Sequence, residues 1–268
     1  MKFLNHLTFG QYLPADSIIH RMDPRAKILG IVLLLTGVFI VNSLNTFIVW
    51  FAILTVITFM SKLPFKVILK SAKPVIILVI FTACIHLFLT DGEILVKAGF
   101  LKITYEGLRM GIYMAMRLLL LVLFASLLTL TTTPMELADG LEKLFSPLKV
   151  VGFPAHELAM MMTIALRFIP TLLDETDRIM KAQLARGADL DRGSIFKRLK
   201  AFIPVLVPLF VIVFQRAEDL ALAMESRCYK GGKGRTRMKS LKWNFHDSLA
   251  FCVLIAVVTA VVMIDARL

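Results

Sequence analysis

Apolar runs separated by short polar breaks dominate the chain as far as residue 132, and one more run lies near its end. Five runs approach the roughly 20 residues that a helix needs to cross about 30 Å of hydrocarbon: 26–41, 46–60, 74–90, 105–132 and 249–264. The first run follows Asp23-Pro24, where aspartate can cap a helix and proline fits its first position. The pattern therefore predicts five membrane-spanning helices, the shorter of which borrow flanking residues.

Two of the breaks between these runs have a character of their own. Between residues 61 and 73, four lysines recur close to a helical period, with apolar residues on the other side: Lys62, Lys66, Lys70 and Lys73. This pattern is typical of a short amphipathic helix that lies in the membrane interface, here on the cytoplasmic leaflet. Residues 91–104 contain two glycines and predict an outer loop or a small hairpin.

Beyond residue 133 the pattern changes, because charged residues now mix with apolar ones at helical spacing. Three helices are predicted, at 135–150, 155–186 and 194–227. Internal prolines should bend the last two: Pro170, Pro204 and Pro208. The apolar run at 201–214 is short for a span, so we expect a buried or membrane-grazing helix there.

Residues 228–242 contain six Lys or Arg, three glycines and no acid, which predicts a solvated basic linker. The pattern thus divides the chain into three regions. Residues 1–133 form an N-terminal membrane domain with four spans, 134–247 a cytoplasmic helical region, and 248–268 a C-terminal transmembrane helix.

Composition and charge agree with this division. Hydrophobic residues make up 58% of the chain and the mean hydropathy is +0.78, so the predicted fold class is an all-α integral membrane protein with about five transmembrane helices plus a cytoplasmic domain of long helices. A net charge of +12 would suggest a nucleic-acid partner for a soluble protein. Here 26 of the 31 Lys and Arg fall in the N-terminus, 61–73 and 134–247. The positive-inside rule therefore places these segments, and the N-terminus, in the cytoplasm, and no nucleic-acid partner is expected.

A short motif with a single arginine occurs twice in the second half of the chain. The first copy is Gln183-Leu184-Ala185-Arg186-Gly187, and the second is Ala223-Met224-Glu225-Ser226-Arg227-Cys228-Tyr229. An arginine at a helix C-terminus is favoured by the helix dipole, and its planar donors suit a carboxylate on a partner. Two interpretations are open: ordinary capping arginines or anchors for another protein. The repetition favours the second.

The residues offer little for catalysis or metal binding. His156-Glu157 begins like a zinc-protease helix, but Met160 stands where the second histidine is required. Gly231-Gly232-Lys233-Gly234 lacks the first glycine of a phosphate loop, and its last glycine replaces the Ser or Thr that binds magnesium. We therefore expect no metal site and no ATP binding by this chain. Arg117, inside the fourth span, predicts either an ion pair within the helix bundle or an intramembrane contact with a partner.

Three segments of the chain resemble a known family. His20-Arg21-Met22-Asp23-Pro24-Arg25-Ala26-Lys27 is similar to the entry motif of the T components of energy-coupling factor (ECF) importers. Ala185-Arg186-Gly187 resembles the first Ala-Arg-Gly signature of their coupling helices. Ser226-Arg227-Cys228 resembles the second, with Ser and Cys in place of Ala and Gly. The spans, the helical region and the final span also follow the family's order over nearly the whole chain.

The resemblance implies a scaffold that couples energy in an ABC-type importer of a vitamin or metal ion, in the cytoplasmic membrane of a prokaryote. Two cytoplasmic ABC ATPases would hold Arg186 and Arg227, one each, and a small membrane protein that captures substrate, the S component, would pack on the helices of this chain. ATP and magnesium would belong to the ATPases, so no cofactor is expected in this chain. Two other classes stay open: a membrane-anchored adaptor whose basic region at 228–242 binds anionic lipid, and an intramembrane enzyme, for which the sequence shows no catalytic pair.

Overall fold

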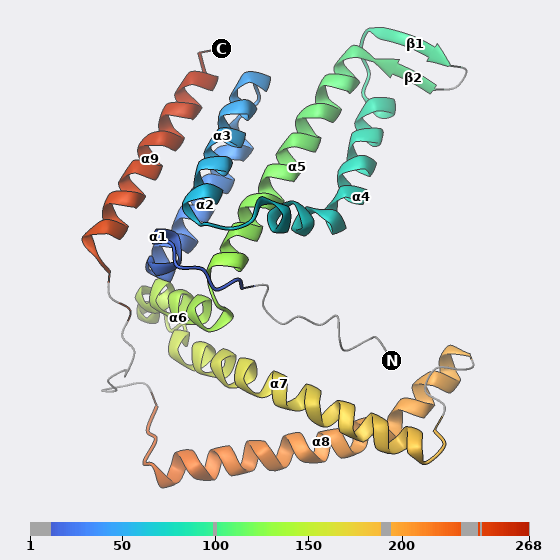
Figure 1. Cartoon of the computed structure of the whole chain (residues 1–268), viewed down its shortest axis with the longest axis vertical. Coiled ribbons are helices and arrows are strands. Elements are labelled where there is room, and N and C mark those ends of the chain that lie inside the picture. The colour runs from blue at the N-terminus through green and yellow to red at the C-terminus, as the bar shows by residue number, and fades with distance from the viewer. Residues whose placement is uncertain (1–11, 99–100, 189–193, 232–240, 242, 268) are drawn as a thin grey trace. The chain divides into compact units, whose positions relative to one another are not determined.

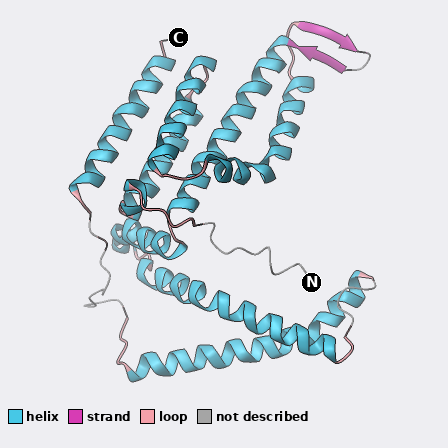
Figure 2. Ribbon diagram, in the orientation of Figure 1, coloured by secondary structure: helices cyan, strands magenta, loops and turns pink. Residues whose placement is uncertain are grey.

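The structure, a computed structural model, describes residues 12–98, 101–188, 194–231, 241 and 243–267. Most of this part of the chain is helical (Figure 1): α1 (Ile18–Arg21), α2 (Pro24–Ile40), α3 (Leu44–Met60), α4 (Phe65–Leu89), α5 (Tyr105–Thr131), α6 (Pro134–Phe145), the 3₁₀ helix η2 (Ser146–Val151), α7 (Ala155–Ala185), α8 (Ile195–Ser226) and α9 (Phe245–Asp265). The strands of the described residues, β1 (Ile94–Ala98) and β2 (Leu101–Thr104), form one antiparallel hairpin (Figure 2). This hairpin is the second of the two forms predicted for 91–104. The predicted helical membrane fold class is confirmed.

Contacts within the chain group its residues into two compact units. Of the described residues, we call those within 12–141 and 241–267 the bundle unit, and those within 142–231 the long-helix unit. The bundle unit holds α1 to α5, most of α6, and α9, whereas the long-helix unit is built on α7 and α8. The sequence also predicted that residues 134–247 lie on the cytoplasmic side of the membrane, and this stays a prediction.

The core of the bundle unit lies among α2, α3, α5 and α9. Trp50 and Phe124 are fully buried there, with their rings edge to face at 6.0 Å. Gly37 of α2 makes the close packing possible, because a Cβ at this position would lie 2.6 Å from Trp50 and 2.9 Å from Val258. Small residues at such crossings let membrane helices approach closely.

Helix α4 corrects one prediction. The sequence pattern predicted a separate interfacial helix at 61–73 followed by a span at 74–90, but one continuous helix covers Phe65–Leu89 with Pro74 inside it. Its ribbon changes direction between its two ends (Figure 1), as an internal proline causes. The residues on both sides of Pro74 stay helical. In a membrane the backbone groups must form hydrogen bonds within the protein, and a bent but continuous helix meets this requirement better than a break would.

Helices α4 and α5 run antiparallel with their backbones in contact. A Cβ at Gly107 would lie 2.7 Å from the carbonyl oxygen of His86, and one at Gly111 would lie 3.1 Å from that of Ala83. These glycines are four residues apart on one face of α5, which is the small-residue spacing of close helix pairs in membranes. The spacing of the two glycines in the sequence is a signal for this close helix pair.

In the part of the chain that the structure describes, five helices are long and apolar enough to cross a membrane. This is the number that was predicted, but they are not the same five. They are α4, α5, α7, α8 from Leu199 onward, and α9. Helices α2 and α3 have 17 residues each, or about 25 Å at 1.5 Å per residue, which is the short end of the spanning range. Helix α7 and the part of α8 from Leu199 onward each contain an apolar stretch long enough to cross a membrane. The sequence pattern predicted no span in either helix.

Candidate coupling site

Helix α7 ends in a turn that places Arg186 at its C-terminal cap. Gly187 follows in the left-handed conformation, with φ at 86°. The Gly187 N–H donates to the Leu184 carbonyl over 2.9 Å, and the Ala188 N–H donates to the Gln183 carbonyl over 3.0 Å. These two bonds define a Schellman motif, which satisfies carbonyl groups that a helix end would leave free.

Helix α8 ends in the same motif, with Arg227 as its cap. Cys228 takes the left-handed position, with φ at 54°. Its N–H donates to the Glu225 carbonyl over 2.8 Å, and the Tyr229 N–H donates to the Met224 carbonyl over 3.0 Å. The two copies of the sequence motif therefore share one backbone geometry and carry their arginines at the same position in it.

The departures in the second copy change this geometry little. A left-handed residue with a Cβ costs roughly 1–2 kcal/mol, so Cys228 takes with strain the conformation that Gly187 takes freely. Ser226 stands where the first copy has Ala185, and its hydroxyl donates back to the Ala223 carbonyl over 3.0 Å. Arg227 therefore has small side chains on both sides in the sequence, as Arg186 does.

Both arginine side chains are exposed. Among the described residues, neither guanidinium takes part in an ion pair or a hydrogen bond. Arg178, on the same helix as Arg186, instead lies 3.6 Å from Glu175. The backbone of each arginine forms a helix cap, while its side chain has no polar partner among the residues that the structure describes and is exposed to a possible partner protein.

The two helices form an antiparallel pair. Three side-chain contacts join them along their length: Gln183 Nε2 to the Pro204 carbonyl (3.2 Å), Arg216 Nη2 to Glu175 Oε1 (3.5 Å), and Tyr229 Oη to Met160 Sδ (2.9 Å). Arg186 therefore lies at one end of the pair and Arg227 at the other. The stretch of α7 between these ends corresponds to about 40 Å at 1.5 Å per residue.

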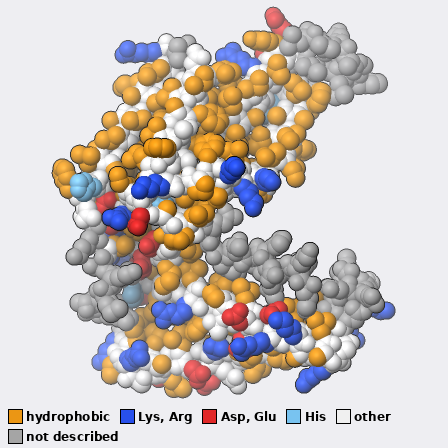
Figure 3. All heavy atoms as spheres, in the orientation of Figure 1, with side chains coloured by type: hydrophobic (Ala, Val, Ile, Leu, Met, Phe, Trp, Pro, Cys, Tyr) orange, Lys and Arg blue, Asp and Glu red, His pale blue; other side chains and the backbone are white. Residues whose placement is uncertain are grey.

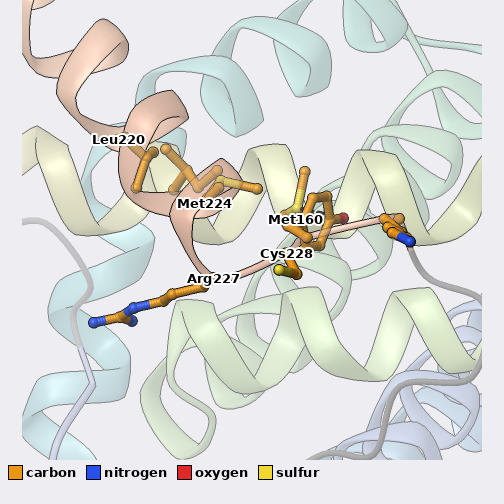
Figure 4. Close-up of a pocket in the computed structure, with 9 residues that line it drawn as sticks. Met160, Leu220, Met224, Arg227 and Cys228 are labelled. Carbon is orange, nitrogen blue, oxygen red and sulfur yellow. Dashed lines mark hydrogen bonds between the residues drawn. The ribbon is translucent and has the colours of Figure 1, made fainter.

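A cavity of about 440 Å³ lies beside Arg227, between the beginning of α7 and the end of α8. Met160, Ile164, Leu220 and Met224 line it together with 227–231. In Figure 4 the guanidinium of Arg227 points away from the other labelled side chains. Thioether and aliphatic side chains line one part of the cavity and adapt easily to a changing neighbour, and two cationic residues, Arg227 and Lys230, belong to the same lining.

The entry motif joins the beginnings of α2 and α9. Asp23 caps α2 as predicted: its Oδ1 accepts from the Arg25 N–H over 2.9 Å, and Pro24 is the first helical residue. The Asp23 N–H donates to Asp247 Oδ1 over 3.3 Å, and Asp247 also accepts from the Asn244 N–H over 3.0 Å in the capping box of α9. Two buried carboxylates therefore fix two helix N-termini side by side.

The arginines of the entry motif differ in their surroundings. Arg25 donates to the Leu241 carbonyl over 3.2 Å and lies over the Trp243 ring at 5.9 Å, so it holds the segment before α9. Arg21 is exposed and pairs with exposed Asp16 at 3.3 Å, a contact that contributes little to stability. Of the two roles predicted for the motif, the contacts describe the structural one, and the partner role stays a prediction.

His20 links the N-terminal segment to the bundle. Its Nδ1 lies 2.7 Å from Ser17 Oγ and its Nε2 lies 3.1 Å from the Leu13 carbonyl. Burial lowers the pKa of His20, although the hydrogen bond to Leu13 acts in the opposite direction. Lys27 Nζ donates to the carbonyls of His20 and Thr131, both over 3.1 Å, so a cation stabilises the C-terminus of α5.

Arg117 holds the turn between α2 and α3. Its Nη2 donates to the Val41 carbonyl over 2.7 Å and to Asn42 Oδ1 over 3.0 Å. On the same turn, Asp265 from the end of α9 accepts from the N–H groups of Asn42 and Ser43, each over 3.0 Å. Arg117 thus forms hydrogen bonds within the bundle, and among the described residues it has no ion pair of the predicted kind. A partner contact stays a prediction.

Sequence reasoning missed the acids that join helix ends. Asp247 and Asp265 flank the last apolar run, and that position was their one visible signal. Glu142 was also missed: its Oε1 lies 3.1 Å from His156 Nδ1 and links α6 to α7. Within the described ranges, no three His, Cys, Asp or Glu side chains come together as a metal site.

The long apolar helices define a multi-pass membrane protein, and comparisons with known proteins identify its kind. A family model described as "Cobalt transport protein" matches residues 15–239. The energy-coupling factor transporter transmembrane protein EcfT of Thermanaerovibrio acidaminovorans is 55% identical over 265 residues, which cover 99% of this chain and 98% of that protein. Proteins of the same name from Clostridium kluyveri and Bacillus subtilis are 52% and 45% identical, over 95% and 94% of this chain and 95% and 96% of their own lengths.

The chain is therefore a membrane subunit of a transporter and not itself a catalytic enzyme. It belongs to the family of energy-coupling factor transporter transmembrane proteins.

Proposed function

We propose that this chain is the energy-coupling scaffold of an importer, in which α7 and α8 carry ATP-driven motion from two partner ATPases to a substrate-binding S component. The observation that carries the proposal is the pair of matching helix ends. Each ends in the same Schellman motif, and each presents an exposed arginine without a partner among the described residues. The relatives' name, which contains "energy-coupling factor", supports the same function.

The chemistry of the two ends suits one ATPase each. A guanidinium at a helix C-terminus is favoured by the dipole and can bind a carboxylate through two parallel hydrogen bonds. The ends are about 40 Å apart along α7, so a separate protein can approach each of them. The nucleotide would belong to those proteins, because this chain has no phosphate-loop motif.

The long-helix unit also carries apolar surface for a membrane partner. Large side chains of α8 are exposed over the stretch that contains its two prolines: Phe202, Ile203, Leu206, Val207, Phe210, Val211 and Phe214. Figure 3 shows hydrophobic side chains interleaved with charged ones on this unit. Exposed apolar surface of this extent marks contact with lipid or protein. An S component that packs on it would change position when the helix pair moves.

The charge distribution supports an orientation for the complex. We infer that the N-terminus and the long-helix unit face the cytoplasm of a prokaryotic cell, because most Lys and Arg lie in these segments. Labelling in sealed cells tests this orientation. A cysteine introduced at Lys66 should resist an impermeant reagent from outside, and its labelling would contradict the proposed topology.

Co-purification tests the function itself. The tagged full chain should retain two ATPase subunits from membranes of its host, and the double variant Arg186→Ala with Arg227→Ala should release them. Each lost charged hydrogen bond costs about 2–5 kcal/mol, and each 1.4 kcal/mol is tenfold in affinity.

Arg178→Ala is the matched control. Arg178 is an exposed arginine on α7, the helix that carries Arg186, but its side chain already pairs with Glu175 within the chain. The control should retain the ATPases. Full retention by the double variant, with normal transport, would remove the central claim. If neither the native chain nor the control variant retains an ATPase, the result would favour a membrane-anchored adaptor.

A further inference from the structure

A row of exposed lysines lies at the beginning of α4 and in the turn before it. We call Lys62, Lys66, Lys70 and Lys73 the lysine row, and all four are exposed. Among the described residues, none of them takes part in an ion pair or a hydrogen bond. Figure 3 shows basic side chains gathered over this part of α4. The row is thus a concentration of charge that contacts within the chain do not use.

The same turns of α4 have two other sides. Ile68 and Ala72 are buried against the core of the bundle unit. Phe65 and Leu69 are about half exposed, at 48% and 53%. At 100° per residue these two side chains lie between the buried side and the lysines. The helix therefore presents an open apolar strip directly beside an open cationic strip, while its third side is held by the protein.

Stability within the chain does not account for the lysines. The first turn of α4 contains no acid, and cations near a helix N-terminus are disfavoured by the dipole. The row lies at the end of the bundle where α2 and α9 begin and where α3 and α5 end. Helices that cross a membrane would leave its apolar region at this end, at the level of the lipid headgroups.

We propose that the lysine row binds the phosphate groups of anionic phospholipids, with Phe65 and Leu69 inserted among the adjoining acyl chains. Lys66, Lys70 and Lys73 match a surface of phosphates because they lie along one side of the helix, and exposed Lys62 adds a fourth cation from the turn before it. The buried side of α4 fixes the depth at which they meet the headgroups. This inference uses the membrane location of the chain and does not use the paired arginines, so it stands or fails apart from the proposed function.

The expected effect follows from the number of charges. Each lysine near an anionic membrane surface favours association by about fivefold. The effect weakens with salt, because exposed charges are screened within about 10 Å at ordinary ionic strength. We therefore expect the bound lipid to be several-fold richer in anionic lipid than the surrounding bilayer, and the enrichment to fall when salt is raised.

The test measures which lipids stay with the protein. The purified full chain is reconstituted in bilayers of phosphatidylglycerol and phosphatidylcholine in equal amounts and extracted gently. The retained lipids are then quantified by mass spectrometry. The native chain should retain several-fold more phosphatidylglycerol than phosphatidylcholine. The variant with glutamine at all four positions of the row should fall close to the bulk ratio, and the variant with arginine at all four should keep the enrichment.

Two controls make the outcome decisive. Glutamine at Lys143, Lys149, Lys181 and Lys200 makes the same change of charge in the long-helix unit and should leave the enrichment in place. Inorganic phosphate should displace no more phosphatidylglycerol than chloride at matched ionic strength. Unchanged enrichment in the glutamine variant of the row, loss of enrichment in its arginine variant, equal loss in the control, or selective displacement by phosphate would each overturn the proposal.

Discussion

The two helix ends of the long-helix unit have nearly the same hydrogen bonds and different residues at the position that matters most. At the end of α7 the bonds measure 2.9 and 3.0 Å and glycine takes the left-handed position, whereas at the end of α8 they measure 2.8 and 3.0 Å and cysteine takes it. The comparison shows that the Schellman turn forms because it provides hydrogen bonds to the last carbonyl groups of each helix. Glycine in the left-handed position makes this turn easier to form but is not required for it. The first end is thus relaxed and the second is held against roughly 1–2 kcal/mol of strain.

The largest expected effects come from removing one arginine at a time. If the two ends are equivalent anchors, Arg186→Ala and Arg227→Ala should each weaken ATPase binding by about 2–5 kcal/mol. Titration of the purified chain with each ATPase subunit measures the loss. Lysine at either position should recover only part of it, because it keeps the charge without the planar fork of donors. Loss of binding from one variant alone would show that the matching geometry does not give matching function.

Exchanging the residues of the left-handed position tests the strain directly. Gly187→Cys should destabilise the end of α7 by roughly 1–2 kcal/mol. Cys228→Gly should stabilise the end of α8 by less, about 1 kcal/mol at most, because glycine gains freedom in the unfolded chain. Hydrogen exchange at the amides of the two turns measures both changes. No gain in stability at the end of α8 from Cys228→Gly would mean that the cysteine is not strained.

The contact between Tyr229 and Met160 belongs to the second end alone. Tyr229→Phe removes a hydroxyl that lies 2.9 Å from the thioether sulfur, so we expect a loss of about 0.5–1 kcal/mol in local stability at the end of α8. The amides of 227–229 should then exchange faster, while those of 186–188 keep their rates. Leu222→Ala, an exposed position on the same helix, serves as the control and should leave both sets of rates nearly unchanged.

The smallest effect is expected at Ser226. Its hydroxyl bonds back to the Ala223 carbonyl within the helix, and alanine already stands at the equivalent position of the first end. Ser226→Ala should therefore change stability and ATPase binding by no more than about 0.5 kcal/mol. A larger loss of binding, measured by the same titration, would show that this hydroxyl contacts the partner.

The helices and the arginine-bearing ends could be predicted because their signals are local. Asp23-Pro24 marks the beginning of α2 through cap chemistry that two residues supply. The apolar runs locate most helices to within a few residues, since length and composition decide whether backbone groups can be buried in lipid. The arginines were found because the same residue recurred at two predicted helix ends.

The remaining features depend on distant parts of the chain. Pro74 bends α4 without ending it. The residues on both sides of Pro74 did not indicate whether the helix would bend or end there. Asp265 meets Asn42 and Ser43 from the far end of the chain, so its role is visible only once α9 packs beside α2. Cys228 was recognised as a departure from the family signature, but its left-handed backbone follows from a hydrogen-bond pattern that no residue type specifies.

The antiparallel arrangement of α7 and α8 has a mechanical consequence. Opposed forces at the two arginine ends produce a torque whose moment arm is set by the roughly 40 Å between them, whereas parallel forces only translate the pair. The ion pair between Glu175 and Arg216 joins the helices between those ends and resists sliding, so the pair would rotate as one body. Pro204 and Pro208 lie in the half of α8 nearer Arg186. Because prolines weaken a helix locally, we expect α8 to bend more easily toward that end than toward Arg227.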